Sequence, residues 1–396
     1  MELTLDAAKW RGLRGAARVL DALGADEGLT RYVGGAVRDE LMGLPVSDVD
    51  LATRIRPQDV IRRLEDAGVK AVPTGIEHGT ITAVSDGHPF EITTLRHDVS
   101  TDGRRATVAF TDDWEADAAR RDFTINALFA DAVTGEIFDY FGGLDDLAER
   151  RVRFIGAPLQ RIAEDHLRIL RFFRFHARFG LGDPDVAGLD ACTARANDLM
   201  ALSRERIADE LLKLLGLADP AATVGVMLQR GILRPVLPEI EPERLCELEA
   251  LIANERAAKV AADPLRRLTA LLPRDPRVAD QVAARLKLSK KARQRLACSA
   301  SDGLDGTPDA LAYRLGADCA TDRLILSGLP AEAAKIRDWR KPTLPIGGGA
   351  LIARGLTEGP IVARTLRRIE DQWVESGFPT GAKFDALVDD ALRSAV

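Results

Sequence analysis

The chain has 396 residues and a mass of 43.0 kDa, more than one ordinary domain needs, so roughly two to four compact units are expected. Hydrophobic residues make up 46% and charged residues 29% of it, which is typical of globular proteins and excludes a disordered or fibrous chain. With 55 Lys and Arg against 61 Asp and Glu, the formal net charge of −6 excludes a uniformly basic coat, so any polyanionic partner must be bound by a local patch.

The first predicted elements are a helix and then a mixed sheet. Apolar side chains at three- and four-residue spacing over 6–24 predict an amphipathic helix that ends at Gly24. Over 31–139, short β-branched runs alternate with Gly, Asp and Pro turns, which predicts a small α+β domain. The expected strands are 80–84, 90–94, 107–110 and 136–138, and the expected helices are 57–67 and 118–127.

A glycine pair in this domain is a candidate phosphate-binding turn. Gly34 and Gly35 follow an apolar run and precede a predicted helix. Two adjacent glycines let the backbone approach a ligand closely, and N–H groups at a helix start favour an anion, so Arg38 could reach a phosphate there. The alternative is a tight strand-to-helix turn without a ligand.

Three acidic residues are candidate ligands for a hard cation. If Asp48 and Asp50 lie on a strand, their carboxylates point to one face, an arrangement that suits Mg²⁺. Glu91 lies in a strand-like apolar run, where an inward charge is costly unless it is paired or metal-bound. It could complete a two-metal site from a neighbouring strand. The alternatives are a solvated turn and an outward-facing Glu91.

Beyond residue 157 the pattern predicts only amphipathic helices. The helix predicted over 164–179 carries a polar stripe at three- and four-residue spacing. Surface ion pairs would explain part of this stripe, but its arginines exceed what one flanking acidic pair can neutralise. Arg171 and Arg174 could therefore reach phosphates. The stripe comprises Asp165, Arg168, Arg171, Arg174 and Arg178, and the helices are broken at 180–184, 218–220, 272–276 and 344–349.

The cysteines and the hydropathy pattern bear on the compartment. Cys192, Cys246, Cys298 and Cys319 form no CxxC pair, so neither a zinc site nor a disulfide framework is expected. A reducing compartment is the simplest interpretation. No segment has the form of a signal peptide or a membrane span, so a cytoplasmic protein without membrane contact is expected.

Taken together, the motifs resemble the class II CCA-adding tRNA nucleotidyltransferase and bacterial poly(A) polymerase family. The resemblance is close over 31–180 and weaker beyond. It implies an α+β fold, with a small mixed-sheet nucleotidyltransferase head followed by an all-helical neck, body and tail. The implied bounds are 1–139, 140–218, 219–275 and 276–396. The matching motifs are Gly-Gly-x-Val-Arg-Asp at 34–39, Asp-x-Asp at 48–50, Arg-Arg-Asp-Phe-Thr-Ile-Asn-Ala at 120–127 and Glu-Asp-His-Leu-Arg at 164–168.

The resemblance also implies roles for the matched residues. Asp48 and Asp50 would bind the metal ions, with Glu91 as the third catalytic acid. Asp165 and Arg168 would act as a protein template: the carboxylate accepts from the exocyclic amine of cytosine or adenine and the guanidinium donates to the ring nitrogen. Uracil and guanine present the opposite polarity and would be rejected. The implied triphosphate and ribose contacts are Gly34, Gly35, Arg38, Arg121, Asp122 and Asn126.

The implied activity is template-independent addition of C, C and A to tRNA 3′ ends from CTP and ATP, by two-metal chemistry with Mg²⁺ and release of pyrophosphate. The tRNA would be bound at its 3′ end and acceptor arm. A polar segment at 96–105 matches a flexible loop of members that add all three nucleotides, and an ordinary hairpin is the alternative. Six cations and no acid in 285–295 predict RNA contacts, or else a solvated helix face. These contacts would involve Lys287, Lys290, Lys291 and Arg293.

Three other functions remain open at this point. A poly(A) polymerase would use the same fold and chemistry, although the segment 72–80 lacks the basic run that those relatives carry. A relative that adds only CC or only A would carry the same motifs. An inactive RNA-binding protein is disfavoured by intact Asp48, Asp50 and Arg121.

Overall fold

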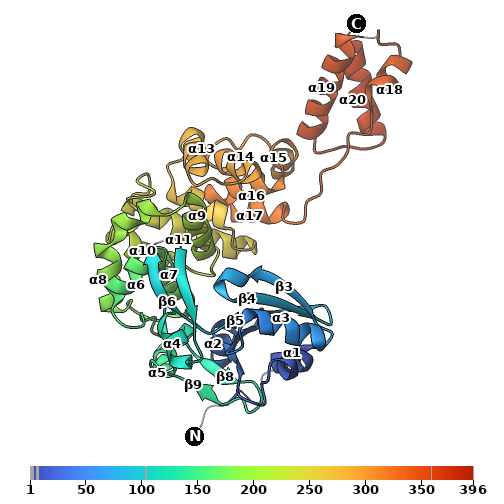
Figure 1. The fold of residues 1–396 in the computed structure, drawn as a ribbon. Coiled ribbons are helices and arrows are strands. Elements are labelled where there is room, and N and C mark those ends of the chain that lie inside the picture. Colours follow the sequence, from blue (N-terminus) through green and yellow to red (C-terminus); the bar gives the residue numbers. More distant parts are fainter. Residues whose placement is uncertain (1–3, 6–8, 103–104, 358, 396) are drawn as a thin grey trace. The chain divides into compact units, whose positions relative to one another are not determined.

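The computed structural model describes residues 4–5, 9–102, 105–357 and 359–395. The chain forms two compact units, which Figure 1 shows in sequence colours: Met1–Ser203 with Arg230–Pro235, and Arg204–Gln229 with Val236–Val396. Every strand that the structure describes lies in the first unit, and the second unit is helical. The predicted fold class, a mixed-sheet head followed by helices, is confirmed. Across the described ranges, no helix is long and apolar enough to cross a membrane.

A seven-stranded mixed sheet forms the centre of the first unit. Strand β2 lies between β5, to which it is parallel, and β1, to which it is antiparallel. The parallel register places Asp50 beside Glu91. All four strands predicted from the sequence are present. In sheet order the strands are β3 (Lys70–Gly75), β4 (Thr80–Ser85), β5 (His88–Thr94), β2 (Asp50–Thr53), β1 (Thr30–Val33), β8 (Phe129–Asp131) and β9 (Ile137–Phe138).

A separate hairpin follows β5. It consists of β6 (Arg96–Asp102) and β7 (Arg105–Phe110), which pair antiparallel as a two-stranded sheet. The segment 96–105, for which the sequence left a flexible loop and a hairpin open, therefore forms a hairpin, and Gly103 and Arg104 lie outside the described residues.

The helices of the first unit differ from the prediction in three places, the third of which is described in the next paragraph. Of the helix expected over 6–24, residues 6–8 lie outside the described residues, and the α-helix in the described part covers 16–22, because Gly15 has a positive φ of 81° and starts a new helix there. The helix expected over 118–127 ends at Ala119, and Phe123 has an extended backbone. The α-helices are α1 (Ala16–Ala22), α2 (Gly35–Leu41), α3 (Pro57–Asp66), α4 (Trp114–Ala119), α5 (Gly143–Ala148), α6 (Pro158–Glu164), α7 (Arg168–Phe179) and α8 (Val186–Ala194). Short 3₁₀ turns occupy Lys9–Gly12, Ile76–His78, Thr124–Asn126 and Ala196–Ala201.

The prediction of one continuous helix over 164–179 is wrong at residues 165–167, which are not helical. Helix α6 ends at Glu164, Asp165 has an extended backbone with φ −150° and ψ 106°, and α7 begins at Arg168. The Asp165 carboxylate accepts a hydrogen bond of 3.1 Å from the backbone N–H of Leu167. Such a local side-chain bond offers the backbone an alternative to the helix. Asp165 therefore belongs to a turn, while the stripe's arginines lie on α7.

Aromatic packing fixes the position of α7. Phe172 stacks on Phe154 with ring centroids 5.4 Å apart, and Phe175 lies 5.2 Å from Phe123. All four rings are buried. Each contributes roughly 1.5–3 kcal/mol by leaving water. The opposite, arginine-bearing side of α7 is thereby held in one orientation.

The second unit contains twelve α-helices in its described part. Of the four breaks predicted beyond residue 157, 180–184 and 218–220 lie between helices, 272–276 ends on Pro276, where the next helix begins, and 344–349 overlaps the helix that begins at Gly348. The helices are α9 (Arg204–Leu215), α10 (Ala221–Gln229), α11 (Leu245–Ala258), α12 (Pro264–Leu271), α13 (Pro276–Arg285), α14 (Lys290–Ser299), α15 (Pro308–Leu315), α16 (Ala317–Leu326), α17 (Pro330–Lys335), α18 (Gly348–Ala353), α19 (Pro360–Glu375) and α20 (Ala382–Arg393), and a 3₁₀ turn covers Pro242–Arg244.

Charged side chains cross the interior of this unit. Arg266 contacts Glu255 at 2.7 Å and Asp322 at 2.8 Å, and Asp322 also accepts from Arg295 at 2.7 Å. Arg267 pairs with Glu255 at 2.9 Å. We call these five residues the buried ionic network. It joins α11, α12, α14 and α16.

A disulfide bond also joins two of these helices. Cys298 of α14 and Cys319 of α16 are bonded, with their Cα atoms 6.1 Å apart. The sequence-based expectation of no disulfide is therefore wrong. The two cysteines are 21 residues apart in sequence, and only the packing of α14 against α16 brings them together. Cys192, which is buried, and Cys246, which is exposed, are free thiols.

Candidate functional site

The three predicted acids, which we call the acidic edge, lie on or just before two neighbouring strands. Asp50 is the first residue of β2, and Glu91 lies opposite it on β5. Asp48 precedes the strand and accepts a 2.8 Å hydrogen bond from the Ser47 hydroxyl. Asp48 and Glu91 are exposed, and Asp50 is half-buried. The structure thus brings together the carboxylates that the sequence pattern paired.

The electrostatics of Asp50 indicate an excess of negative charge. Burial raises the pKa of Asp50 to about 6; the Glu91 carboxylate adds to this effect, Arg121 opposes it, and Asp48 makes a smaller contribution. A cation would relieve this repulsion, and carboxylate oxygens are ligands that Mg²⁺ prefers. Within the described ranges, no group of three or more Asp, Glu, His or Cys side chains converges closely enough to hold a metal ion by itself. The residues therefore fit a divalent ion that takes its other ligands from water or a substrate.

The glycine turn lies beside this acidic edge. Gly34 has φ 69° and ψ −119°, a conformation that favours glycine, and it directly precedes α2. A Cβ on Gly34 would lie 3.4 Å from Nη1 of Arg121 and 3.5 Å from the carbonyl oxygen of Asn126. The turn therefore packs closely against two other predicted nucleotide-site residues.

Four predicted residues form a continuous hydrogen-bonded chain. Arg38 donates to the side-chain oxygen of Asn126, and the Asn126 amide donates to Asp122 at 3.0 Å. Arg171 donates to the other oxygen of Asp122 at 2.8 Å. Burial alone would raise the pKa of Asp122, but Arg171 and Asn126 outweigh it and lower that pKa. The chain connects the glycine-turn helix α2 to α7.

The sequence interpretation missed two acids that hold the site's arginines. Asp117 accepts from Arg120 at 2.7 Å, from Arg121 at 3.1 Å and from the backbone N–H of Arg96 at 3.2 Å. Its side chain is 1% exposed, and its spacing of three and four residues from the arginines was a usable signal. The second acid is Asp39. It contacts the guanidinium groups of its neighbour Arg38 and of Arg178 on α7.

Arg168 is held rigidly, and Asp165 lies next to it. The Arg168 guanidinium contacts Glu164 at 2.6 Å and donates to the carbonyl oxygens of Arg161 and Arg120, each at 3.0 Å. Its side chain is 13% exposed. Asp165 is half-buried in the turn between α6 and α7. Arg174 lies over the ring of Phe175, 4.6 Å from its centroid.

The predicted RNA-contacting cations are partly neutralised within the second unit. Lys287 pairs with Glu205 at 2.8 Å, and Arg293 pairs with Asp280. Lys290 and Lys291, at the start of α14, are exposed and take part in none of the ion pairs found among the described residues. These two lysines therefore retain the most accessible positive charge of the four.

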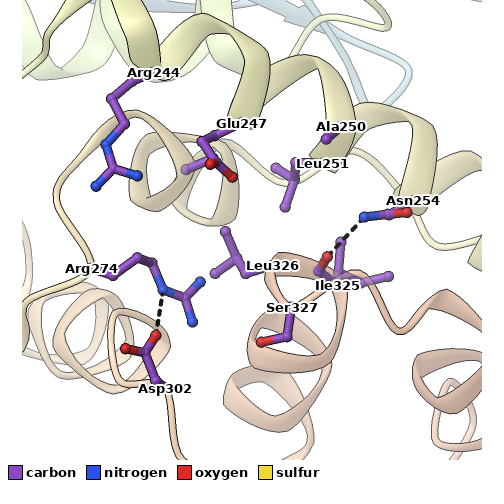
Figure 2. A pocket seen from close by; sticks show the side chains of 11 residues that line it. Arg244, Glu247, Ala250, Leu251, Asn254, Arg274, Asp302, Ile325, Leu326 and Ser327 are labelled. Carbon is purple, nitrogen blue, oxygen red and sulfur yellow. Dashed lines mark hydrogen bonds and ion pairs between the residues drawn. The ribbon is translucent and has the colours of Figure 1, made fainter.

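A cavity of about 260 Å³ lies elsewhere in the second unit (Figure 2). In Figure 2, Arg274 pairs with Asp302 at 3.1 Å, and Asn254 donates to the carbonyl oxygen of Ile325 at 3.2 Å. None of the residues predicted from the sequence to act in the site lines this cavity. It is distinct from the acidic edge and its arginines.

Comparison with known proteins identifies similar chains over most of the length. The family model described as the poly A polymerase head domain matches residues 30–153, and one described as the probable RNA and SrmB-binding site of polymerase A matches 188–244. The chain is 35% identical to the mitochondrial CCA tRNA nucleotidyltransferase 1 of Homo sapiens, covering 88% of this chain and 83% of the relative. It is 31% identical to the CCA-adding enzyme of Streptococcus sanguinis, covering 88% and 90%.

Solved structures show the same architecture. The crystal structure of the Bacillus stearothermophilus CCA-adding enzyme in complex with CTP matches with a TM-score of 0.73 and 26% identity, covering 96% of this chain and 98% of the other. The Thermotoga maritima CCA-adding enzyme complexed with tRNA matches with a TM-score of 0.69 and 20% identity over the whole of both chains. At that identity the second likeness concerns the fold alone.

Proposed function

We propose, because the chain belongs to the family of CCA-adding tRNA nucleotidyltransferases, that it adds C, C and A to tRNA 3′ ends from CTP and ATP and releases pyrophosphate. The observation that carries this proposal is the acidic edge at Asp50 and Glu91, with Arg121 and the Gly34 turn beside it. No nucleic acid template is required, because a carboxylate and a guanidinium can select the base.

Asp48 and Asp50 would hold the divalent metal ions, which we propose to be Mg²⁺, with Glu91 as the third acid. Mg²⁺ is usually held by one or two carboxylates and completes its shell with water and substrate phosphates, so the absence of a three-ligand group in the described chain is compatible with this assignment. Such an ion supplies positive charge for an in-line displacement at the α-phosphorus. The raised pKa of Asp50 supports the proposal, since burial and, after it, the Glu91 carboxylate disfavour the ionised form of Asp50, which a bound cation would favour.

The remaining predicted residues would bind and orient the nucleotide. The backbone N–H of Gly35 at the start of α2 and the guanidinium of Arg38 would face the triphosphate, while Gly34, whose own N–H donates to the carbonyl oxygen of Leu128 at 3.0 Å, would allow a close approach of the ligand. Arg121, fixed by Asp117, lies near enough to Asp50 to lower its pKa, so it would contact a nucleotide beside the acidic edge. Arg171 and Arg174 would contribute positive charge from α7.

Base selection is assigned to Asp165 and Arg168. The three hydrogen bonds of Arg168 to the protein hold its guanidinium in one orientation, which a template residue needs. Asp165 lies in the turn before α7, where its carboxylate is oriented by the hydrogen bond of 3.1 Å from the backbone N–H of Leu167.

Incubation with tRNA that lacks its terminal CCA, labelled CTP and ATP, and Mg²⁺ tests the function. We expect addition of three nucleotides, and we expect Asp48→Asn to abolish it. Asp66→Asn, which alters an exposed carboxylate at the end of α3, serves as the control and should remain active. Failure of the wild type to incorporate either nucleotide would refute the proposal. A long tail of A would instead identify a poly(A) polymerase, and CC or A alone a partial activity.

Competition between CTP, ATP, UTP and GTP tests the template assignment. We expect Asp165→Ala to incorporate UTP or GTP at least tenfold more readily than the wild type does, since one lost specific contact removes about 1.4 kcal/mol or more of discrimination. Asp145→Ala on α5, where the carboxylate is exposed, is the control. Unchanged selectivity in the Asp165 variant would remove Asp165 from this role.

The compartment and the RNA contacts are further proposals. We propose that the protein acts in the cytoplasm, as the sequence pattern predicts; the human relative carries the word mitochondrial in its name. We also propose that Lys290 and Lys291 contact RNA, because their charge is not neutralised by the ion pairs described around them. The head, neck, body and tail bounds derived from the sequence stay predictions.

A further inference from the structure

The disulfide in the second unit lies outside the nucleotide site and has no part in the proposed reaction. Cys298 is the penultimate residue of α14, and Cys319 lies in the first turn of α16. We propose that this pair is a redox modification site, at which thiol–disulfide exchange with a reducing dithiol or with glutathione opens the bond between α14 and α16, and exchange with an oxidised disulfide such as oxidised glutathione closes it again.

The two sulfur atoms differ in access. Cys319 is 5% exposed, whereas Cys298 is half-buried, so an incoming thiolate can approach Cys298 more easily. The Nη2 atom of Arg323 lies 3.8 Å from Sγ of Cys298, and hydrogen bonds of 2.8 Å to the carbonyl oxygens of Cys298 and Gly303 hold its guanidinium there. This positive charge attracts an approaching thiolate and stabilises the Cys298 thiolate once it is formed.

Cys319 is placed to act as the leaving group. It is the third residue of the ten-residue helix α16, where backbone N–H groups lack intrahelical partners and the helix dipole favours negative charge. Thiols in such positions have lowered pKa values and leave faster in exchange. In the reduced state, Arg323 would stabilise the Cys298 thiolate, and the start of α16 would stabilise the Cys319 thiolate. A disulfide in a wholly apolar core has no such groups beside it.

The exchange balances with a dithiol as the reductant. One thiolate of the dithiol attacks Sγ of Cys298, the bond between Cys298 and Cys319 breaks, and its electron pair passes to Sγ of Cys319. The second thiolate of the reductant then attacks the reductant's first sulfur atom, which is bonded to Cys298 in the mixed disulfide. This displaces the Cys298 thiolate. Two electrons pass from the dithiol, which becomes a disulfide, and water supplies the protons that the cysteine thiolates take up.

Opening the disulfide would loosen α14 without removing its other contacts. Arg295 and Ser299 of α14 both bond to Asp322 of α16, each within 2.7–2.8 Å. The cavity of Figure 2 would respond as well, because Asp302 follows α14 and Ser327 ends α16, and both line it. The disulfide therefore limits how far these two walls of the cavity can separate.

Equilibration of the full chain in glutathione buffers of graded ratio tests the proposal. Thiol titration in denaturant should find two free thiols at the oxidised end, from Cys192 and Cys246, and four at the reduced end. The midpoint should fall within the accessible range of ratios. The Tm should be about 5–10 °C higher in the oxidised state, as expected for a loop of this size in a unit of this size.

Cysteine variants separate the proposal from a general effect of reductant. Cys319→Ser should show the lower Tm in every buffer, and Cys246→Ser, which alters the exposed free thiol, should retain the full redox response. Four free thiols under all conditions would overturn the proposal. A bond that stays closed at every glutathione ratio would also overturn it, because the pair would then be a permanent cross-link.

Discussion

Asp50 illustrates how a residue of the site opposes the stability of the fold. Its pKa of about 6 in the folded protein lies above the ordinary 3.8. For a carboxyl group with a raised pKa, the folded state loses stability as pH rises from about 4 to about 6 and regains none above that. The ionised carboxylate therefore lowers the stability of the folded protein at neutral pH, a cost that the proposed metal ion would offset.

Because ionised Asp50 lowers the stability of the folded state, its replacement in Asp50→Asn should raise that stability. In metal-free protein at pH 7.5 the variant should be more stable than the wild type by about 1–3 kcal/mol, since one pKa unit corresponds to about 1.4 kcal/mol. The difference should vanish near pH 4, and nucleotide addition should be lost. Denaturant melts in EDTA at both pH values measure it, with Asp66→Asn as the neutral control. A destabilised variant at pH 7.5 would contradict this account.

Asp122 shows the opposite case, a buried acid that needs its partner. Arg171 lowers its pKa, so the pair contributes stability above about pH 4 that is lost as pH falls through the lowered pKa. We expect Arg171→Ala to cost about 3–5 kcal/mol, because a buried carboxylate is left without its charge partner. Arg178→Ala, an exposed position on the same helix, should cost less than about 1 kcal/mol. Urea unfolding followed by circular dichroism would measure both, and equal costs would argue against this role.

Residue patterns predicted the candidate site residues themselves better than the residues that hold them in place. Strand periodicity and apolar flanks, which are local properties of the sequence, pointed to the acids at 48, 50 and 91; the structure places Asp50 beside Glu91 in the sheet and Asp48 just before the strand. Asp117 and Asp39 were missed because their roles depend on contacts with other segments, such as Asp39 with Arg178, 139 residues away. The disulfide was missed for the same reason.

At the scale of elements, the sequence predicted four of the nine strands that the structure describes, and its helix bounds in the first unit were wrong in three places. The boundary at Asp165 is the most informative of these. Hydrophobic periodicity continued through Asp165, yet the structure breaks the helix there with a side-chain bond to Leu167. Periodicity records which face is apolar and does not record a single residue that leaves the helix.

The buried ionic network is the element-scale feature that invites a direct test. Asp322 is 0% exposed and bonds to Arg266, Arg295 and Ser299, so it ties together α12, α14 and α16. Asp322→Ala should destabilise the second unit by about 2–4 kcal/mol, because Arg266 and Arg295 each lose one of two carboxylate partners and keep only Glu255 and Asp263, respectively. Asp338→Ala, whose side chain is 88% exposed, is the control. A cost below 1 kcal/mol, measured by urea unfolding, would mean that the network contributes little.

At the scale of the whole molecule, the predicted nucleotide site and the proposed RNA-contacting lysines lie in different units. Every predicted nucleotide-site residue lies in the first unit, and the buried ionic network and Lys290 lie in the second. Asp322→Ala should therefore leave CTP affinity within about twofold of wild type, while addition to tRNA falls sharply at temperatures where the second unit has melted. Calorimetry with CTP and the addition assay would be run side by side. Parallel loss of both would show that the units fold as one.

The depth of the buried ionic network has a consequence for ionic strength. At 1 M salt the Debye length is about 3 Å, which screens exposed charges such as Lys290 and Lys291 from a polyanion. The side chains of Arg266, Arg267 and Asp322 are at most 6% exposed, so mobile ions cannot reach them. A wash at about 1 M salt should therefore strip RNA from the protein and leave its Tm nearly unchanged, with full activity after dilution. Salt alone would thus separate the exposed charges that bind RNA from the buried ion pairs that stabilise the fold.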